Sequence, residues 1–120
     1  MSIKVNSSGD FKNIETYLIK HKKSPFTDDD IEQIAEYGLY LFGKNTPTKS
    51  GKTAASWVYS IEQTKHGIVI NFDNTNIQNG LNIAILIDSG HATSTGKWYS
   101  GEKYIDKTIK QICSYINKLN

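Results

Sequence analysis

The stretch WVYSIEQTKHGIVINF (residues 57–72) decides the fold class, because apolar side chains recur in it at every second position. Trp57, Tyr59 and Ile61 fall on one face of an extended chain, and the same alternation resumes after the segment KHG. A period of two on both sides of a glycine-containing turn is typical of a β-hairpin. The sequence therefore predicts two antiparallel strands in the middle of the chain.

Helical periodicity precedes this hairpin. Thr27 is a good N-cap, three aspartates follow it at the positive end of the helix dipole, and Gly43 and Asn45 end the pattern. The apolar stripe of this predicted helix is Ile31, Ile34, Ala35, Gly38, Leu41 and Phe42. A first helix is predicted from about residue 7 to the residues before Pro25, from the spacing of Phe11, Ile14 and Leu18.

The C-terminal half adds strands and one more helix. NIAILID (residues 82–88) is a continuous apolar run that predicts a strand covered on both faces, and WYS (98–100) is expected to pair back on it. DNTNIQNG before it is expected to be a long, mobile loop. The last predicted helix has the stripe Ile105, Ile109, Ile112, Ile116 and Leu119.

These elements predict one α+β domain over residues 1–120. Its helical part covers about residues 7–43 and comprises two N-terminal helices. An antiparallel sheet of three to four strands with long loops covers 54–100, and a C-terminal helix packed on the sheet covers 101–119. Helices that are kept apart from strands in the sequence favour this arrangement over alternating βαβ units.

Composition lowers the expectation for several classes of protein. The formal net charge is only +2, and all 14 basic residues are lysines. Proteins that read guanine edges or clamp phosphates bidentately usually use arginine, so specific nucleic-acid recognition is not favoured. A single cysteine, no signal-peptide pattern and no apolar run of membrane-spanning length predict a cytoplasmic protein with no membrane partner.

Two glycine-lysine pairs resemble phosphate loops but have the wrong spacing. Five residues separate Gly90 from Gly96, where a phosphate loop has four, and Lys97 precedes Trp98 instead of a hydroxyl residue. The segment GKT at residues 51–53 has the hydroxyl but lacks the earlier glycine. No nucleotide or other cofactor is therefore expected.

A small hydrolase is a less favoured alternative. Asp88, Ser89 and His91 are close in sequence, but neighbouring residues of a strand point to opposite faces, and no nucleophile-elbow motif is present. Cys113 could formally pair with His91, but it sits late in the last helix beside the buried stripe, whereas reactive thiols favour helix N-termini or cationic surroundings. The histidines have no partner at metal-ligand spacing, so neither a catalytic nor a metal site is expected.

Two long polar loops remain as candidate functional elements, at residues 43–53 and around 90–96. Loops longer than a simple connection are often binding elements. The lysines of the first loop, Lys44, Lys49 and Lys52, leave open an alternative function as a small nucleic-acid-binding accessory protein. The candidate contact residues in the two loops are Lys49, Lys52, His91, Thr93, Lys97, Trp98 and Tyr99.

With the stretches TKSGKTAASW and NIAILIDSGHATSTGKWYSGEKYI, the sequence resembles the head–tail joining, or tail-completion, proteins of long-tailed double-stranded DNA bacteriophages. The resemblance covers about residues 44–118. Two departures are Lys52, where the family often has arginine, and Ala92, where it often has glycine. The matching positions are Pro47, Gly51, Ser56, Ala84, Asp88, Gly90, His91, Thr93, Gly96, Tyr99, Tyr104 and Ile105.

The resemblance implies a minor structural protein of the virion neck with no catalytic residues. Its expected partners are further copies of itself in a cyclic ring and neighbouring neck, portal-adaptor or tail proteins. DNA would be present only as cargo that passes through the ring. The protein would lie in the host cytoplasm before assembly and could be a monomer when free.

Overall fold

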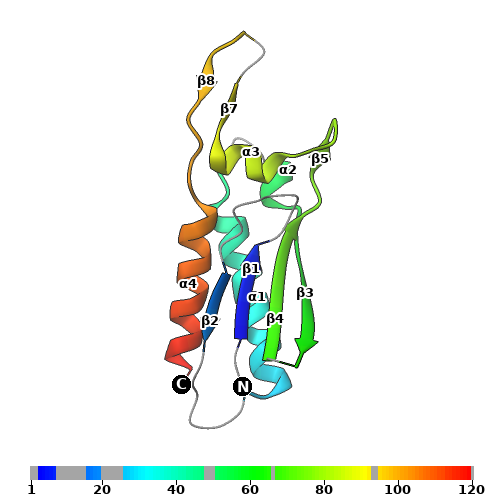
Figure 1. Cartoon of the computed structure of the whole chain (residues 1–120), viewed down its shortest axis with the longest axis vertical. Helices are drawn as coiled ribbons and strands as arrows, with labels where there is room; N and C mark the ends of the chain where they lie inside the picture. Colours follow the sequence, from blue (N-terminus) through cyan, green and yellow to red (C-terminus); the bar gives the residue numbers. More distant parts are fainter. Residues whose placement is uncertain are drawn as a thin grey trace.

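A four-stranded sheet with two long helices on one face forms the body of the protein (Figure 1). The molecule is elongated, with extents of 55 × 25 × 20 Å. Fold and contacts in this computed structural model are described for residues 3–7, 16–19, 26–47, 51–65, 67–92 and 95–119.

The sheet has the strand order β2-β1-β4-β3 within the described ranges. The central hairpin predicted from the sequence is confirmed, since strands β3 and β4 pair antiparallel from Trp57↔Asn74 to Thr64↔Gly67. The strands are β1 (Ile3–Ser7), β2 (Thr16–Ile19), β3 (Trp57–Thr64) and β4 (Gly67–Asn74).

The predicted first helix is wrong where the structure describes that part of the chain. Ile3–Ser7 and Thr16–Ile19 are strands that pair with each other, while Phe11 and Ile14 lie outside the described residues. β1 also pairs parallel to β4, so the predicted purely antiparallel sheet is wrong as well. Pairing with β1 satisfies the backbone groups along the free edge of β4, and this non-local gain overrides a helical spacing that rests on three apolar residues.

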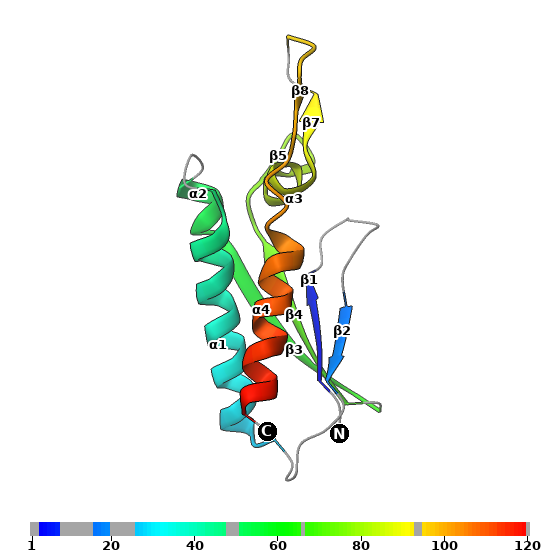
Figure 2. The same cartoon turned by 90° about the vertical axis from the view of Figure 1, so that its left-hand side faces the viewer.

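Helices α1 (Asp28–Asn45) and α4 (Ile105–Lys118) pack side by side against the sheet (Figure 2). The predicted cap of α1 is confirmed as a capping box, in which Thr27 Oγ1 accepts from the Asp30 amide and Asp30 Oδ2 accepts from the Thr27 amide. The predicted apolar stripe of α1 is buried throughout. The stripe of α4 is buried from Ile105 to Ile116, and Leu119 is half-buried.

Aromatic side chains fill the core between α1 and the β3–β4 hairpin. The ring of Phe42 lies 4.4 Å from that of Trp57 and 5.0 Å from that of Phe72, measured between centroids. Gly38 makes this contact possible, because a Cβ atom there would collide with the Phe72 ring and lie 3.0 Å from Ile112 Cδ1. A glycine in the middle of α1 therefore lets the helix approach both the sheet and α4.

One end of the body carries several short elements, which we call the apical end (upper part of Figure 1). The predicted strand at residues 82–88 is wrong, because Ile83–Ser89 form a helix capped by Asn82. The predicted partner of WYS is wrong too, since Trp98–Tyr99 pair with His91–Ala92. The apical elements are α2 (Gly51–Ala54), β5 (Ile77–Gln78), β6 (Leu81–Asn82), α3 (Ile83–Ser89), β7 (His91–Ala92) and β8 (Trp98–Tyr99).

Candidate functional site

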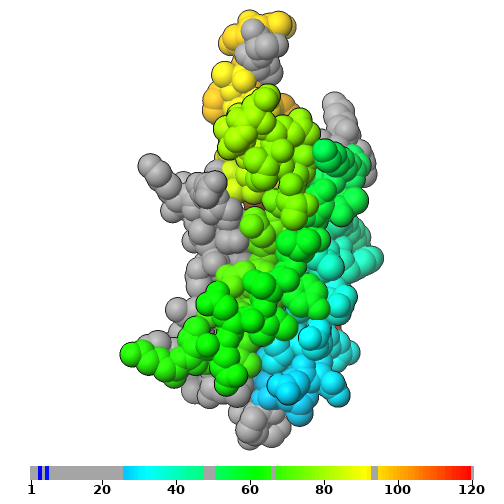
Figure 3. Space-filling view, turned by 90° about the vertical axis from the view of Figure 1, so that its right-hand side faces the viewer, coloured from blue at the N-terminus to red at the C-terminus, as the bar shows by residue number. Residues whose placement is uncertain are grey.

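The hairpin of β7 and β8 projects away from the body (Figures 1 and 3). Its register pairs His91 with Tyr99 and Ala92 with Trp98. Trp98 is 67% exposed, the largest exposed fraction among the big apolar side chains of the described residues. The hairpin therefore presents a large aromatic side chain to solvent at one end of the molecule.

Two glycines shape the base of this hairpin. Gly90 has φ +91°, and a Cβ atom there would collide with the carbonyl oxygen of Tyr99 and lie 2.8 Å from the Gly101 nitrogen. A Cβ atom on Gly101 would in turn collide with the carbonyl of Asp88. The two chain segments thus approach more closely at the base than any residue with a side chain would allow.

Hydrogen bonds fasten the segment after β8 to α3. The amides of Glu102 and Lys103 donate to the carbonyls of Ile87 and Asp88, at 2.8 and 3.0 Å. The Asp88 carboxylate accepts from the Ile105 amide at 2.8 Å, and so caps α4 from a distant part of the chain. The hairpin is therefore held at its base by α3 and the start of α4.

Tyr104 adds a buried anchor to the same junction. Its side chain is 4% exposed, and its hydroxyl donates to the carbonyl oxygen of Ala84 at 2.8 Å. Burial raises the pKa of this phenol well above its ordinary value, so the hydroxyl remains a donor at any physiological pH. α3 and the start of α4 are thereby joined through a donor that stays protonated at physiological pH.

His91 and Tyr99 form a polar aromatic pair on the hairpin stem. Their ring centroids lie 5.3 Å apart. Tyr99 donates its hydroxyl hydrogen to Glu102 at 3.0 Å, and burial together with this carboxylate raises the pKa of the phenol. Nδ1 of His91 is buried and has no hydrogen-bond partner among the described residues. The two residues face each other across the hairpin register, so their rings pack together on the stem.

A buried polar network supports the rest of the apical end. Thr53 accepts two hydrogen bonds of 2.8 Å, one on its carbonyl from Asn74 and one on its hydroxyl from Asn76. The expected mobile loop at residues 73–80 is instead ordered by this network and by the β5–β6 hairpin. Its turn residues Asn79 and Gly80 have φ +52° and +76°, the conformation of a type I′ turn.

The β5–β6 hairpin exposes two apolar side chains that the sequence reasoning missed. Ile77 and Leu81 are each 51% exposed. The signal was present, because the pair Asn-Gly between two short runs is the strongest short-range indicator of a hairpin. The apical end therefore carries Ile77, Leu81 and Trp98 as exposed apolar groups.

The structure brings together only part of the predicted contact set. His91, Lys97, Trp98 and Tyr99 lie on or beside the β7–β8 hairpin, as the sequence predicted. Lys52 lies apart from them on α2, so the first loop is shorter than expected and is partly helical. The remaining two candidates, Lys49 and Thr93, lie outside the described residues.

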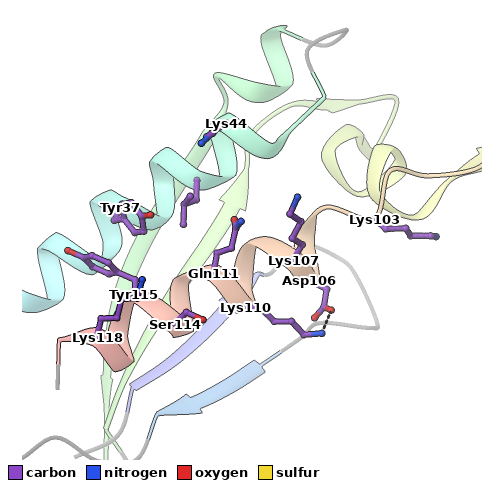
Figure 4. A pocket seen from close by; sticks show the side chains of 11 residues that line it. Tyr37, Lys44, Lys103, Asp106, Lys107, Lys110, Gln111, Ser114, Tyr115 and Lys118 are labelled. Atoms are coloured by element: carbon purple, nitrogen blue, oxygen red, sulfur yellow. Dashed lines mark ion pairs between the residues drawn. The ribbon is translucent and has the colours of Figure 1, made fainter.

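The third lysine of the first loop, Lys44, belongs to a different surface. It lies in the last turn of α1, which extends to Asn45, and it lines a groove between α1 and α4 (Figure 4). The structure therefore does not place Lys44 and Lys52 on one flexible loop.

The residues considered for hydrolysis make structural contacts. Ser89 donates to the Ile85 carbonyl at 2.9 Å, and Asp88 caps α4 as described above. Cys113 is buried, and burial raises the pKa of its thiol to about 11. Within the described ranges, no three His, Cys, Asp or Glu side chains gather into a metal-binding group. None of the described helices is long and apolar enough to cross a membrane.

Comparison of the chain with known protein families, with curated proteins and with solved structures found no match.

Proposed function

We propose that this protein is a structural subunit of the neck of a tailed bacteriophage virion, where it helps to join the tail to the head. The proposal rests on the sequence resemblance over about residues 44–118. One structural observation supports it most directly: Trp98 is largely exposed on a hairpin whose base is held by Gly90, Gly101 and the α3–α4 junction. In this proposal the hairpin docks on a neighbouring virion protein.

An exposed tryptophan on a firmly held hairpin suits such a contact for energetic reasons. Tryptophan is among the residues that dominate binding at interfaces, because its large apolar surface is buried on docking. Ordering a mobile loop would consume part of that gain, at about 0.5–1.5 kcal/mol per immobilised side chain. The hydrogen bonds that fix the base of the hairpin before docking reduce this loss.

The proposed assembly is a closed ring in which each copy contacts the next through two different surfaces. Such heterologous contacts close a ring when a whole number of the rotations that relate one copy to the next adds up to a full turn. Ile77 and Leu81 on the β5–β6 hairpin are a second exposed apolar group at the apical end, suited to contact a neighbouring copy or ring. DNA passes through the ring, and the subunit reaches the virion neck from the host cytoplasm.

The proposal is tested by a joining assay with separate heads and tails that lack this protein. Trp98→Ala is expected to reduce the yield of joined particles, because the loss of a central tryptophan contact typically lowers affinity by about 30-fold or more. Val58→Ala is the matched control, since Val58 is 45% exposed on β3, away from the hairpin. Circular dichroism and thermal melting establish that both variants are folded.

Two results would overturn the proposal. If folded Trp98→Ala protein joined heads to tails as well as the unchanged protein, the hairpin would not be the contact. If electron microscopy of virions with a labelled subunit placed the label away from the neck, the neck assignment itself would be wrong.

A further inference from the structure

A groove between α1 and α4 collects positive charge on one side of the molecule (Figure 4). The groove has a volume of about 590 Å³, and its lining includes five lysines and one aspartate, a formal charge of +4. The whole chain has a formal net charge of only +2, so the residues outside the groove have a net charge of −2. The lysines are Lys44, Lys103, Lys107, Lys110 and Lys118.

Most of this positive charge remains available to a ligand. The sole carboxylate of the lining, Asp106, lies 3.0 Å from Lys110, its neighbour one helical turn away. Lys107 and Lys118 are exposed and have no ion-pair partner among the described residues. Figure 4 shows Lys44 on α1 and Lys107 on α4 on facing sides of the groove. Lys110 is compensated by Asp106 and Lys103 donates to the Ser89 carbonyl, but the lining as a whole keeps an excess of positive charge, which favours an anionic ligand.

The α1 side of the groove is aromatic. Tyr37 contacts Tyr115 of α4 with 4.4 Å between ring centroids, and it stacks on Tyr40 with 6.2 Å between centroids. Tyr40 is 60% exposed, and the Lys44 ammonium lies 6.0 Å from the centre of its ring. Tyr37 and Lys44 line the groove, and Tyr40 lies beside it on α1, with its ring against that of Tyr37.

From this arrangement we propose that the α1–α4 groove binds single-stranded nucleic acid, with phosphates on Lys44 and the α4 lysines and bases stacked on Tyr37 and on Tyr40 beside the groove. Proteins that bind single strands without sequence preference combine a positive groove with aromatic side chains in this way. About three turns of α4 separate Lys107 from Lys118, which is about 16 Å along the axis. That length matches roughly five nucleotides of a stacked strand at 3.4 Å each.

The composition of the groove favours phosphates over the carboxylates of an acidic protein. Lysine pairs with phosphates and carboxylates alike, so the exposed aromatic rings, which can stack on bases, are what favours a nucleic acid. An acidic peptide would offer no planar base to the exposed part of the Tyr40 ring. The proposal goes beyond the neck role and does not rest on it, because it concerns another surface and its own ligand.

The test is fluorescence anisotropy with a labelled oligothymidylate of about 12 nucleotides, within the usual site size for single-strand binders. Binding is measured in the full chain at about 50 and 200 mM salt. Lys44→Gln/Lys107→Gln is expected to weaken binding about tenfold or more at low salt. The double variant should also flatten the salt slope by about 1.4, since each phosphate contact on a single strand contributes about 0.7.

The matched control is Lys52→Gln/Lys65→Gln, which removes the same charge from exposed positions outside the groove. It should bind within about twofold of the unchanged protein, because distant charges are screened at these salt concentrations. Tyr40→Leu should weaken binding about tenfold without altering the salt slope, because stacking is not an ionic contact. Melting curves confirm that each variant folds.

Four outcomes would overturn the proposal. The first is no binding of the oligothymidylate at low salt, and the second is an equal loss of affinity in the groove and control variants. The third is a duplex of the same length that binds as tightly as the single strand and whose binding is unchanged by Tyr40→Leu. The fourth is displacement of the oligonucleotide by an equal charge concentration of polyglutamate, which would indicate an acidic protein partner instead. None of these outcomes bears on head–tail joining, so the two proposals fail independently.

Discussion

Replacing Gly38 by alanine tests the close packing of α1 on the sheet. Alanine is a better helix former than glycine by about 1 kcal/mol in a helix interior, so the local effect of the change is favourable. At Gly38 the new methyl group would collide with the ring of Phe72, which is fully buried against Phe42 and cannot move aside freely. Overpacking of this kind typically costs about 1–3 kcal/mol.

Gly43→Ala in the same helix separates the two effects. A Cβ atom at Gly43 would lie 3.4 Å from the carbonyl oxygen of Ala54, which is close to ordinary van der Waals contact. Both variants gain the same helix propensity, so the difference in their free energies of unfolding isolates the overpacking term. We expect Gly43→Ala to be stabilised by up to about 1 kcal/mol. Gly38→Ala should be about 2 kcal/mol less stable than Gly43→Ala.

The assay is urea unfolding followed by far-ultraviolet circular dichroism, together with thermal melting. For a domain of this size, 2 kcal/mol corresponds to a difference of roughly 6–12 °C in Tm. The reasoning would be refuted if Gly38→Ala were as stable as Gly43→Ala, because α1 would then lie farther from Phe72 than the structure places it.

Two further predictions concern tyrosine hydroxyls. Tyr104→Phe should lower the free energy of unfolding by about 1–3 kcal/mol, because it leaves the buried Ala84 carbonyl without its donor; unchanged stability in urea unfolding would contradict the anchor role. The hydrogen bond to Glu32, followed by partial burial and the hydrogen bond to Glu36, raises the pKa of Tyr59 to about 12. The hydroxyl of Tyr59 therefore contributes fully to the free energy of unfolding below pH 10, and this contribution is lost as the pH rises through 12. Ultraviolet titration of tyrosinate should therefore lose a component near pH 12 in Tyr59→Phe, and an unchanged titration curve would argue against these hydrogen bonds.

The α1 and α4 helices and the β3–β4 hairpin could be predicted because their signals are local. Thr27 and the aspartates after it cap α1 through contacts within four residues, and apolar spacing of 3.6 or 2 identifies each buried face. A hairpin turn around Gly90–Gly96 could be predicted for the same reason, but Trp98–Tyr99 pair with His91–Ala92 and not with residues 82–88 as expected.

The errors fall where local signals are ambiguous and distant contacts decide. A short apolar run such as IAILI fits a buried strand or a buried helix equally well, and its hydrogen bonds to Asn82 and Tyr104 select the helix. Thr16–Ile19 became a strand because β1 pairs with it on one side and with β4 on the other. Such pairings join residues far apart in the sequence, and no local pattern contains them.

The candidate surfaces divide in the same way. The sequence by itself determined that Trp98 and Tyr99 belong to a hairpin, because turn glycines and alternation are short-range features. Only the tertiary structure decided that the backbone approaches itself closely at Gly90 and Gly101, at the base of the hairpin. It also decided that Tyr37, Lys44 and the α4 lysines line one groove. The physical reason is that charge and stacking act through space, so their arrangement follows from how α1 and α4 pack and not from the order of residues along the chain.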